Sequence, residues 1–192
     1  MEVVEVWSDI VRWLDEYAPV TAASLRVPDP ALDVARLVEE FALTLPADLM
    51  AWWECCDGTD DDVLADVLPP FYTPYGARRS LEAWRCHRRS WAERDEPNGF
   101  GRAGSEATGF HPAWVPIAGD GFADELVVDL RPGPSAGCVL EWEQETSQTA
   151  RPEWADVSAM LSDVRRALVE GTSAGHSHPT VTEDGRLDWQ VC

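Results

Sequence analysis

Three short runs rich in β-branched and aromatic residues stand close together in the second half of the chain, and the connections between them restrict how they can pair. The runs cover residues 114–118, 126–130 and 138–142. Gly-Asp-Gly at 119–121 and Arg-Pro-Gly-Pro at 131–134 separate them, and both sequences are typical of turns. Parallel neighbours would need a crossover of about a dozen residues or more. The runs therefore predict an antiparallel meander.

Amphipathic segments on both sides of these runs predict helices that pack against the sheet. Apolar residues recur in them at the spacing of one helix face, as at Trp7, Ile10 and Leu14. Proline fits the first helical turn and glycine ends a helix, which sets several of the expected boundaries. The predicted helices cover about residues 3–17, 29–41, 46–57, 77–94 and 155–170. Helices together with a meander give an α+β fold.

Three further segments have weaker patterns. Residues 63–68 are apolar but are followed by Pro69-Pro70, and they predict a strand or an irregular edge. Residues 95–109 hold four of the 13 glycines and predict a surface loop. Asp184-Gly185 lies between two alternating arms and predicts a small hairpin near the end. We see no internal repeat and no linker, so residues 1–192 are expected to form a single domain.

Charge restricts the partners of the chain. The sequence has 35 acidic residues against 15 basic ones, all of them arginine, for a formal charge of -20. The acids concentrate in residues 1–68 and 118–163. Such a molecule repels nucleic acid and anionic membrane surfaces and attracts basic proteins. A basic protein is therefore the expected partner, with no nucleic acid and no membrane.

The predicted helix over 77–94 departs from this acidic character. This segment contains six arginines but only two acidic residues, Glu82 and Glu93. Trp84 and Trp91 lie among the arginines in the sequence. Stacking of bases on the tryptophans would make it a nucleic-acid platform, but the acidic remainder of the chain opposes that function. We expect these arginines to pair with acidic regions of the same chain, and the alternative is contact with an acidic partner. They are Arg78, Arg79, Arg85, Arg88, Arg89 and Arg94.

Sequence strings associated with catalysis occur in the wrong context. Gly99–Gly104 matches a dinucleotide-binding string, but no strand is predicted before it and no helix after it. Gly171–Gly175 matches the string of a serine nucleophile elbow, but follows a helix instead of a strand. His176 and His178 are not accompanied by a metal-binding pair. We therefore expect no enzyme activity, no metal and no cofactor.

Location is predicted from what the chain contains. No stretch reaches the roughly 18 apolar residues of a membrane-spanning helix. The first residues alternate acidic and apolar side chains, unlike a secretory leader. The five cysteines are an odd number without regular spacing, which indicates reduced thiols. Adjacent Cys55 and Cys56 could form a redox pair, but they lie in an apolar helical pattern that favours core packing. We expect a cytoplasmic protein.

Several short motifs, in this order and spacing, resemble the SUKH superfamily, whose founding branch is the Smi/Knr family of cell-wall assembly regulators. They are Leu45-Pro46-Ala47-Asp48-Leu49 leading through Trp52-Trp53 to Asp57-Gly58, then Trp114-Val115-Pro116-Ile117, Asp129-Leu130 and Gly137-Cys138-Val139. The resemblance extends from about residue 4 to 171, which leaves 172–192 as a tail. It implies an α+β domain with a mixed, mostly antiparallel sheet flanked by helices, and no catalytic residues.

The resemblance also implies a function. Bacterial members are implicated as immunity proteins that bind and neutralise toxins, many of them nucleases, whose clefts are basic because they hold phosphates. We therefore expect a cytoplasmic inhibitor of a basic toxin domain. The alternative is a regulatory scaffold that binds endogenous proteins without any toxin. Neither function fixes the oligomeric state. The expected contact residues are Asp57, Asp60, Asp61, Asp62, Asp120 and Asp124.

Overall fold

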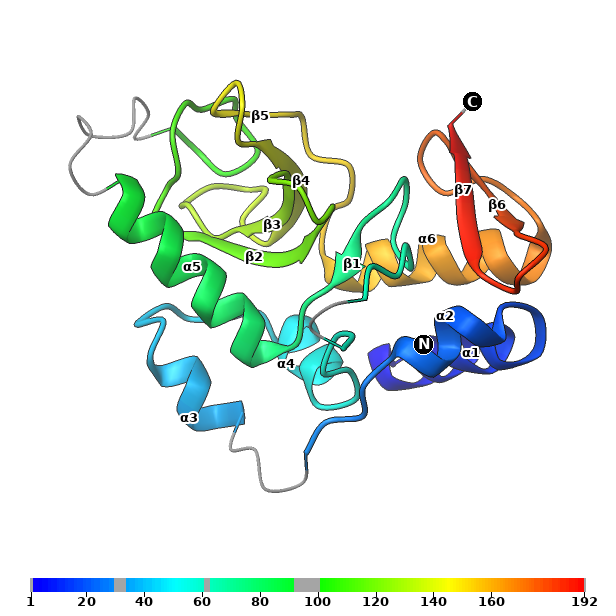
Figure 1. Ribbon diagram of the computed structural model, residues 1–192. Coiled ribbons are helices and arrows are strands. Elements are labelled where there is room, and N and C mark those ends of the chain that lie inside the picture. Colours follow the sequence, from blue (N-terminus) through cyan, green and yellow to red (C-terminus); the bar gives the residue numbers. More distant parts are fainter. Residues whose placement is uncertain (1, 30–33, 61–62, 92–100, 192) are drawn as a thin grey trace.

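A five-stranded antiparallel sheet with helices packed against it organises the chain (Figure 1). The computed structural model describes residues 2–29, 34–60, 63–91 and 101–191. The helices are α1 (Val3–Tyr17), α2 (Pro19–Ser24), α3 (Val34–Glu39), α4 (Ala47–Trp53), α5 (Ala77–Trp91) and α6 (Val157–Glu170). The strands are β1 (Thr73–Pro74), β2 (Trp114–Gly119), β3 (Glu125–Asp129), β4 (Cys138–Glu143), β5 (Gln148–Thr149), β6 (Ser177–Val181) and β7 (Leu187–Val191).

The predicted meander is confirmed. The sheet order is β1-β2-β3-β4-β5, and every strand pair among the described residues is antiparallel. Val128 lies at its centre, opposite Val115 on β2 and Val139 on β4. The register shifts between Pro116 and Ala118, where proline has no N–H to give to a regular ladder. The α+β fold class is likewise confirmed.

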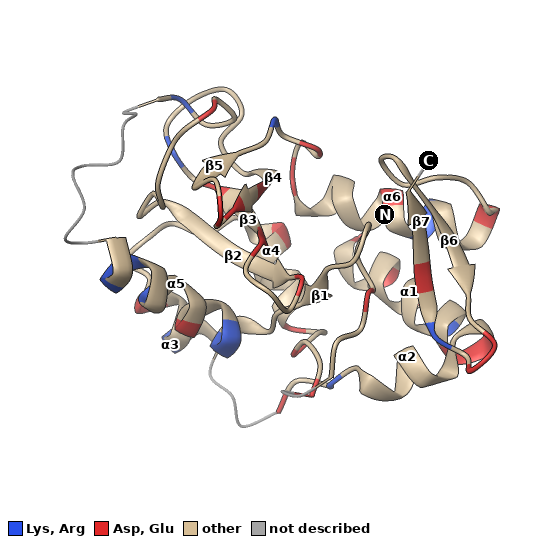
Figure 2. Cartoon of the chain, turned by 45° about the horizontal axis from the view of Figure 1, so that its top comes forward, with Lys and Arg blue, Asp and Glu red and all other residues tan. Residues whose placement is uncertain are grey.

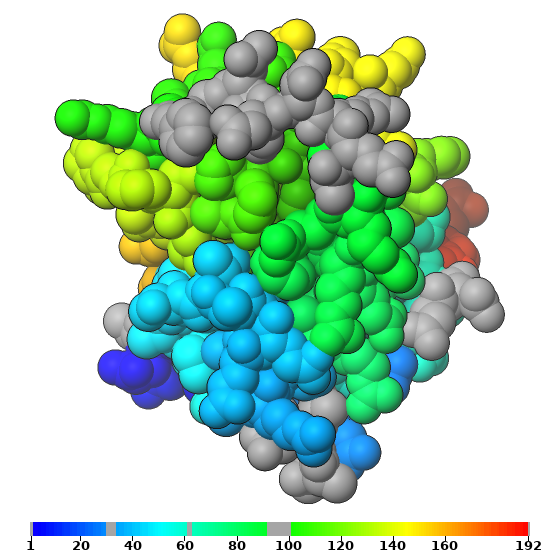
Figure 3. Space-filling view, turned by 90° about the vertical axis from the view of Figure 1, so that its left-hand side faces the viewer, coloured from blue at the N-terminus to red at the C-terminus, as the bar shows by residue number. Residues whose placement is uncertain are grey.

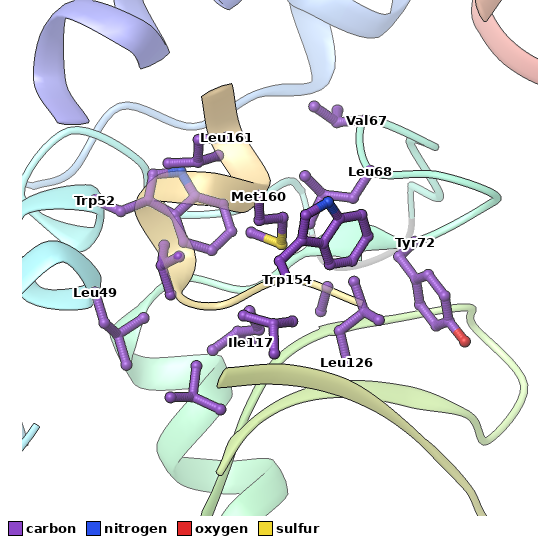
Figure 4. Close-up of a cluster of buried hydrophobic side chains, with 14 of the residues drawn as sticks. Leu49, Trp52, Val67, Leu68, Tyr72, Ile117, Leu126, Trp154, Met160 and Leu161 are labelled. Atoms are coloured by element: carbon purple, nitrogen blue, oxygen red, sulfur yellow. The ribbon is translucent and has the colours of Figure 1, made fainter. Parts of the chain in front are cut away.

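Helices cover both faces of this sheet. Successive residues of a strand point to opposite faces, so Glu125 and Leu126 of β3 mark the two sides. Glu125 reaches His87 on α5, whereas Leu126 lies in a cluster with Met160 and Leu161 of α6 (Figure 4). The helix α1 packs on α6 in turn. Because both faces are covered, β2 and β3 are buried along their whole length, including the polar ends of β3.

The first and last predicted helices form as expected. In α1, Glu2 and Glu5 form a capping box, and Trp7, Ile10 and Leu14 are buried. In α6, the side chain of Asp156 accepts a hydrogen bond from the N–H of Ala159, and Gly171 ends the helix at φ 64°.

The first half differs from the expected pattern in four places. The helix predicted over 29–41 is observed as α3, while its expected start at 30–33 lies outside the described residues. The helix α4 ends at Trp53, several residues before Gly58, and the short α2 was not predicted. Residues 63–68 form no strand, so the irregular alternative holds, and the first strand is instead β1.

The terminal hairpin is confirmed, and it is part of the core. Leu187 and Trp189 are 3% and 5% exposed. The indole Nε1 of Trp189 donates to the Asp66 carbonyl at 2.9 Å, and the N–H of Leu187 donates to Thr21 Oγ1 at 2.9 Å. The hairpin β6–β7 therefore packs on the α1–α2 region and on the irregular segment near Asp66 (Figure 1).

The predicted loop over 95–109 is described from residue 101 onward. This part contains no helix and only one isolated bridge, at Thr108. It is not purely superficial, because Ala103 and Ala107 are buried. The N–H of Gly104 donates to Asp129 Oδ2 at 2.9 Å and ties the loop to the end of β3. Within the described ranges, no helix has the length and apolar character needed to cross a membrane.

Candidate functional site

Two adjoining grooves border α5, and we call them together the double groove. The first has a volume of about 430 Å³ and lies between α5 and the segments that flank Gly58 and Thr73. The second has a volume of about 350 Å³ and lies between α5 and the β2–β3 turn, residues 120–124. Both are lined by Tyr75, Arg79, Glu82 and Gly121, so they form one continuous depression.

Tyr75 forms the boundary between the two grooves. The guanidinium of Arg79 lies 5.3 Å from the centre of its ring. A Cβ atom at Gly119 would come within 1.9 Å of the Tyr75 hydroxyl, so only glycine lets this ring lie across the end of β2. Burial, followed by the nearby Glu125 carboxylate, raises the pKa of Tyr75, and the phenol stays protonated.

The double groove collects the predicted contact residues that the structure describes. Asp57 and Asp60 line the first groove, and Asp120 and Asp124 line the second. Asp61 and Asp62 lie outside the described residues. In all, seven carboxylate side chains and three arginines line the depression. They are Asp29, Asp57, Asp60, Glu82, Asp120, Asp124 and Glu125, with Arg26, Arg78 and Arg79.

Three of the predicted aspartates also hold the fold locally. Asp57 lies 3.7 Å from the Arg26 guanidinium, and its Oδ1 fills the space where a side chain at Gly76 would be. Asp120 Oδ1 accepts hydrogen bonds from the backbone N–H groups of Phe122, Ala123 and Asp124 in the β2–β3 turn, and Asp124 accepts one from the N–H of Gln144. Asp60 is exposed.

An exposed apolar side chain projects between the two turn aspartates. Phe122 is 90% exposed, and no charge pattern pointed to it. Leu64, 54% exposed, contacts the same turn, since a Cβ atom at Gly121 would lie 2.5 Å from Leu64 Cδ2. An exposed aromatic residue with carboxylates around it is the arrangement of many binding hot spots, in which a central anchor is enclosed by a polar rim.

The carboxylates near this turn act on one another. Burial raises the pKa of Glu141, and the negative charges of Asp124 and Asp120 raise it further, whereas a hydrogen bond from the Tyr72 hydroxyl lowers it. Burial and the contact with Glu141 raise the pKa of Tyr72 in turn. Burial is the main cause of the raised pKa of Glu141, and the smaller contributions from Glu143, Asp124 and Asp120 show that several negative charges lie near one another at this end of the sheet.

A hydrogen-bonded group of three side chains lies at the floor of the second groove, and the sequence did not predict it. Glu125, only 6% exposed, is 2.9 Å from His87 Nε2 and accepts from the Tyr75 hydroxyl at 3.4 Å. The His87 ring packs on Phe110 and against the edge of Trp142. Glu125 thus joins α5 and the segment before it to β3. Only the fold could reveal this group, because its members are up to 50 residues apart.

The arginines of α5 are mostly not neutralised internally. Arg85 pairs with Glu40, but Arg78, Arg79, Arg88 and Arg89 form no ion pair with any described residue. The predicted internal pairing is therefore wrong for these four. Trp84 does not offer a stacking platform, because it is 4% exposed, donates to the Pro112 carbonyl and lies under Arg88.

Possible metal ligands and cysteine thiols are the remaining reactive groups among the described residues. Among the described residues, no three His, Cys, Asp or Glu side chains are placed to bind a metal ion. Cys55 and Cys56 do not form a disulfide, and Cys56 is buried as core packing predicts. Burial raises the pKa of Cys55 to about 11 and that of Cys56 to about 12. Both thiols are therefore protonated and unreactive near neutral pH.

The residues that carry the family resemblance lie in structural positions instead. Asp48 accepts from the N–H of Ser158 at 3.0 Å and joins the start of α4 to the start of α6. Asp129 and Arg131 form a buried ion pair of 2.8 Å, with both side chains at most 1% exposed. Most of these motif residues hold the fold together, and Asp57-Gly58 is the part of the motif set that lines the double groove.

Comparisons with known proteins agree with the motifs. A family profile described as SMI1 / KNR4 family (SUKH-1) matches residues 31–163, which is more than half of the chain. The curated protein "Cell wall biosynthesis/cell cycle regulator smi1" of Schizosaccharomyces pombe is 27% identical over 180 residues. The alignment covers 83% of this chain and 35% of the yeast protein, so the chain spans about a third of that relative's length.

Proposed function

The chain belongs to the SMI1/KNR4 (SUKH-1) family, and from that premise we propose that it is a cytoplasmic immunity protein that binds and neutralises a basic toxin domain such as a nuclease. Proteins of this family are commonly immunity proteins and are generally non-catalytic. The observation that carries the proposal is the double groove, where seven carboxylates and the exposed Phe122 meet on one surface.

Electrostatics favours a basic partner for this surface. The net charge of -20 attracts a cationic protein from a distance, which speeds association and makes it sensitive to salt. The acidic residues appear in red in Figure 2, which shows them on loops, helices and strands across the molecule. A nuclease cleft is basic, so an acidic inhibitor that occupies it competes with nucleic acid for the same charges.

Within the proposed surface, the residues have different functions. We assign contact with the partner to Asp60, Asp120 and Asp124, with Phe122 as the apolar anchor between them. Asp57 is held by the groove wall and shapes the site. Asp61 and Asp62 lie outside the described residues, and their contact with the partner is proposed from the sequence alone.

The first experiment identifies the partner. The chain is immobilised and incubated with a lysate of its native host, and bound proteins are eluted at rising salt and read by mass spectrometry. We expect one basic protein that is released as salt screens the contact. Recovery of RNA, or retention of acidic proteins alone, would show that the proposal is wrong.

The second experiment tests the surface with the purified partner. The variant Asp60→Asn, Asp120→Asn and Asp124→Asn keeps an accepting oxygen at each position but removes three charges. The control variant Asp15→Asn, Glu16→Gln and Glu170→Gln removes three charges from exposed positions on α1 and α6. We expect the groove variant to weaken binding by about tenfold or more, and the control much less. If both variants lost the same affinity for the partner, the effect would be one of net charge alone, and the assignment of the contact to the double groove would be wrong.

A regulatory scaffold is the second candidate, and one observation favours it. The yeast relative is named a regulator of cell wall biosynthesis and the cell cycle, and it is similar to most of this chain. The two candidates differ in the nature of the captured protein. A protein that is toxic when produced without this chain, and harmless with it, supports the immunity function. A protein that is harmless by itself supports the scaffold.

A further inference from the structure

The helix α5 has a second exposed flank, separate from the wall of the double groove. Arg85, Arg88 and Arg89 follow one another at the i, i+3, i+4 spacing that places side chains on one side of a helix. With Trp84 and Glu82 they line an open depression of about 540 Å³. We call these three arginines the arginine face.

The arginine face lies beside α3, as Figure 3 shows in the adjoining blue and green surfaces. Arg85 is held by Glu40, which follows α3. The guanidinium of Arg88 lies 4.7 Å from the centre of the Trp84 ring, and this contact restricts its motion. All three arginine residues are exposed. The contacts with Glu40 and Trp84 hold two of them, Arg85 and Arg88, in position.

The positive charge at this face is unusual for the molecule. Within α5 there are five arginines and one acid, Glu82, in a protein with 35 acids. Arg88 and Arg89 form no ion pair with any described residue, although acids are abundant elsewhere (Figure 2). Like charges at i, i+3 and i, i+4 on one helix face repel each other, and Glu40 compensates only Arg85, so a ligand that compensates Arg88 and Arg89 would stabilise the helix.

We propose that the arginine face binds an acidic segment of a second protein, distinct from the basic partner of the double groove. A guanidinium is a planar fork of N–H donors that matches a carboxylate in two parallel hydrogen bonds. Arg88 and Arg89 offer two such forks to a short run of Asp and Glu side chains, and Arg85, paired with Glu40, lies beside them on the same helix face. Nucleic acid fits less well, because its many phosphates would extend beyond the three arginines into the negative field of the remaining surface.

The experiment uses the full chain and a defined probe, hexaglutamate peptide. The ¹⁵N-labelled protein is titrated at low salt and followed by NMR, which reports each arginine Nε–H and the Trp84 indole N–H. We expect saturable shifts at Arg85, Arg88, Arg89 and Trp84. The variant Arg88→Ala with Arg89→Ala should weaken binding by about fivefold or more. The control Arg166→Ala with Arg186→Ala removes the same charge from other exposed arginines and should leave binding nearly unchanged.

Each other outcome would overturn the proposal. Equal weakening by both variants would indicate a global charge effect, and shifts confined to Arg26 and Arg79 would move the site to the double groove. Tighter binding of a hexanucleotide than of hexaglutamate would indicate a nucleic-acid surface. Self-association in sedimentation that the Arg88 and Arg89 variant abolishes would make a second copy the occupant. Absence of saturable shifts would mean that no anion binds there.

Discussion

Asp129 shows how one residue of a family motif serves the fold. Its carboxylate accepts hydrogen bonds from the Arg131 guanidinium, from the N–H of Arg131 and from the N–H of Gly104. The Arg131 side chain also donates to the Ser105 carbonyl and lies 5.3 Å from the centre of the Trp114 ring. One buried pair therefore joins the end of β3 to the loop after residue 101.

Removing one member of this pair should be costly. The substitution Arg131→Met leaves the Asp129 carboxylate buried without its cation, and we expect a loss of about 3–5 kcal/mol in the free energy of unfolding. The matched substitution Arg12→Met removes an arginine that is 72% exposed and pairs with Asp9 on the surface. It should cost less than about 1 kcal/mol. Urea denaturation of both variants measures the difference, and comparable losses would show that burial does not govern the effect.

At the residue scale, the sequence could indicate charge but not the function of each charged group. It pointed to Asp57, Asp120 and Asp124 as contact residues because they are acidic and lie in loops. The structure shows that each also accepts hydrogen bonds or fills a fixed space in its turn. Phe122 could not be recognised, because an aromatic residue in a sequence is equally compatible with the core.

Elements with strong local signals were predicted well. The helices α1 and α6 have regular apolar spacing with capping residues, and the strands β2, β3 and β4 are β-rich runs bounded by turns. The segment 63–68 is irregular, and its apolar residues Val67 and Leu68 are buried by tertiary contacts and not by a strand. No local pattern distinguishes such a segment from a strand.

Substitutions in the hairpin β6–β7 measure how much its contacts with the core contribute to the free energy of unfolding. We expect Trp189→Ala to lower the free energy of unfolding by about 3–5 kcal/mol, because a buried indole and its hydrogen bond to Asp66 are lost. Val191→Ala, at a residue that is 66% exposed on the same strand, should change it by less than about 0.5 kcal/mol. Thermal and urea melts of the two variants provide the comparison. A small effect at Trp189 would mean that the hairpin is an independent tail.

The β2–β3 turn carries the apolar part of the proposed contact. Phe122→Ala should leave the melting temperature unchanged, because the side chain is 90% exposed. The same change should weaken binding of the purified basic partner by about tenfold or more, since aromatic anchors contribute most to hot spots. Val169→Ala on α6 serves as a control at another exposed apolar residue. Calorimetry that gives equal affinities for both variants would exclude Phe122 from the interface.

For the molecule as a whole, the carboxylates make stability depend on pH. Burial raises the pKa of Glu141 and Glu153 in the folded chain. Above the pKa of the unfolded state, near 4.5, the folded chain then holds more protons than the unfolded chain. These two groups consequently destabilise the protein at neutral pH, and this effect diminishes as pH falls through their folded pKa values toward 4.5.

A substitution experiment isolates this effect. The variant Glu141→Gln with Glu153→Gln should be more stable than the parent at about pH 7.5, and the difference should shrink at about pH 5. Comparison with the parent removes the contribution of His111, whose pKa burial lowers and which acts in the opposite direction. The control Glu16→Gln, at an exposed position, should show no such convergence. Urea denaturation at the two pH values measures the difference in the free energy of unfolding between variant and parent. A difference that stays constant or grows as pH falls would contradict the expectation.

At the same scale, the fold could be predicted but the site only in part. Apart from Asp57-Gly58, which lines the first groove, the motifs that resemble the family lie in the core and in structural pairs, so they identify the architecture more than the contact surface. The acidic surplus indicated a basic partner. Only the packing of α5 beside the β2–β3 turn brings Asp60, Asp120 and Asp124 to one depression.

Amide hydrogen exchange of the chain with and without its purified partner tests the central claim most directly. A complex formed through the double groove should slow exchange at residues 57–60 and 119–125 and along the groove side of α5. Protection confined to α1, α6 and the β6–β7 hairpin would contradict it, because the partner would then bind a surface remote from the groove.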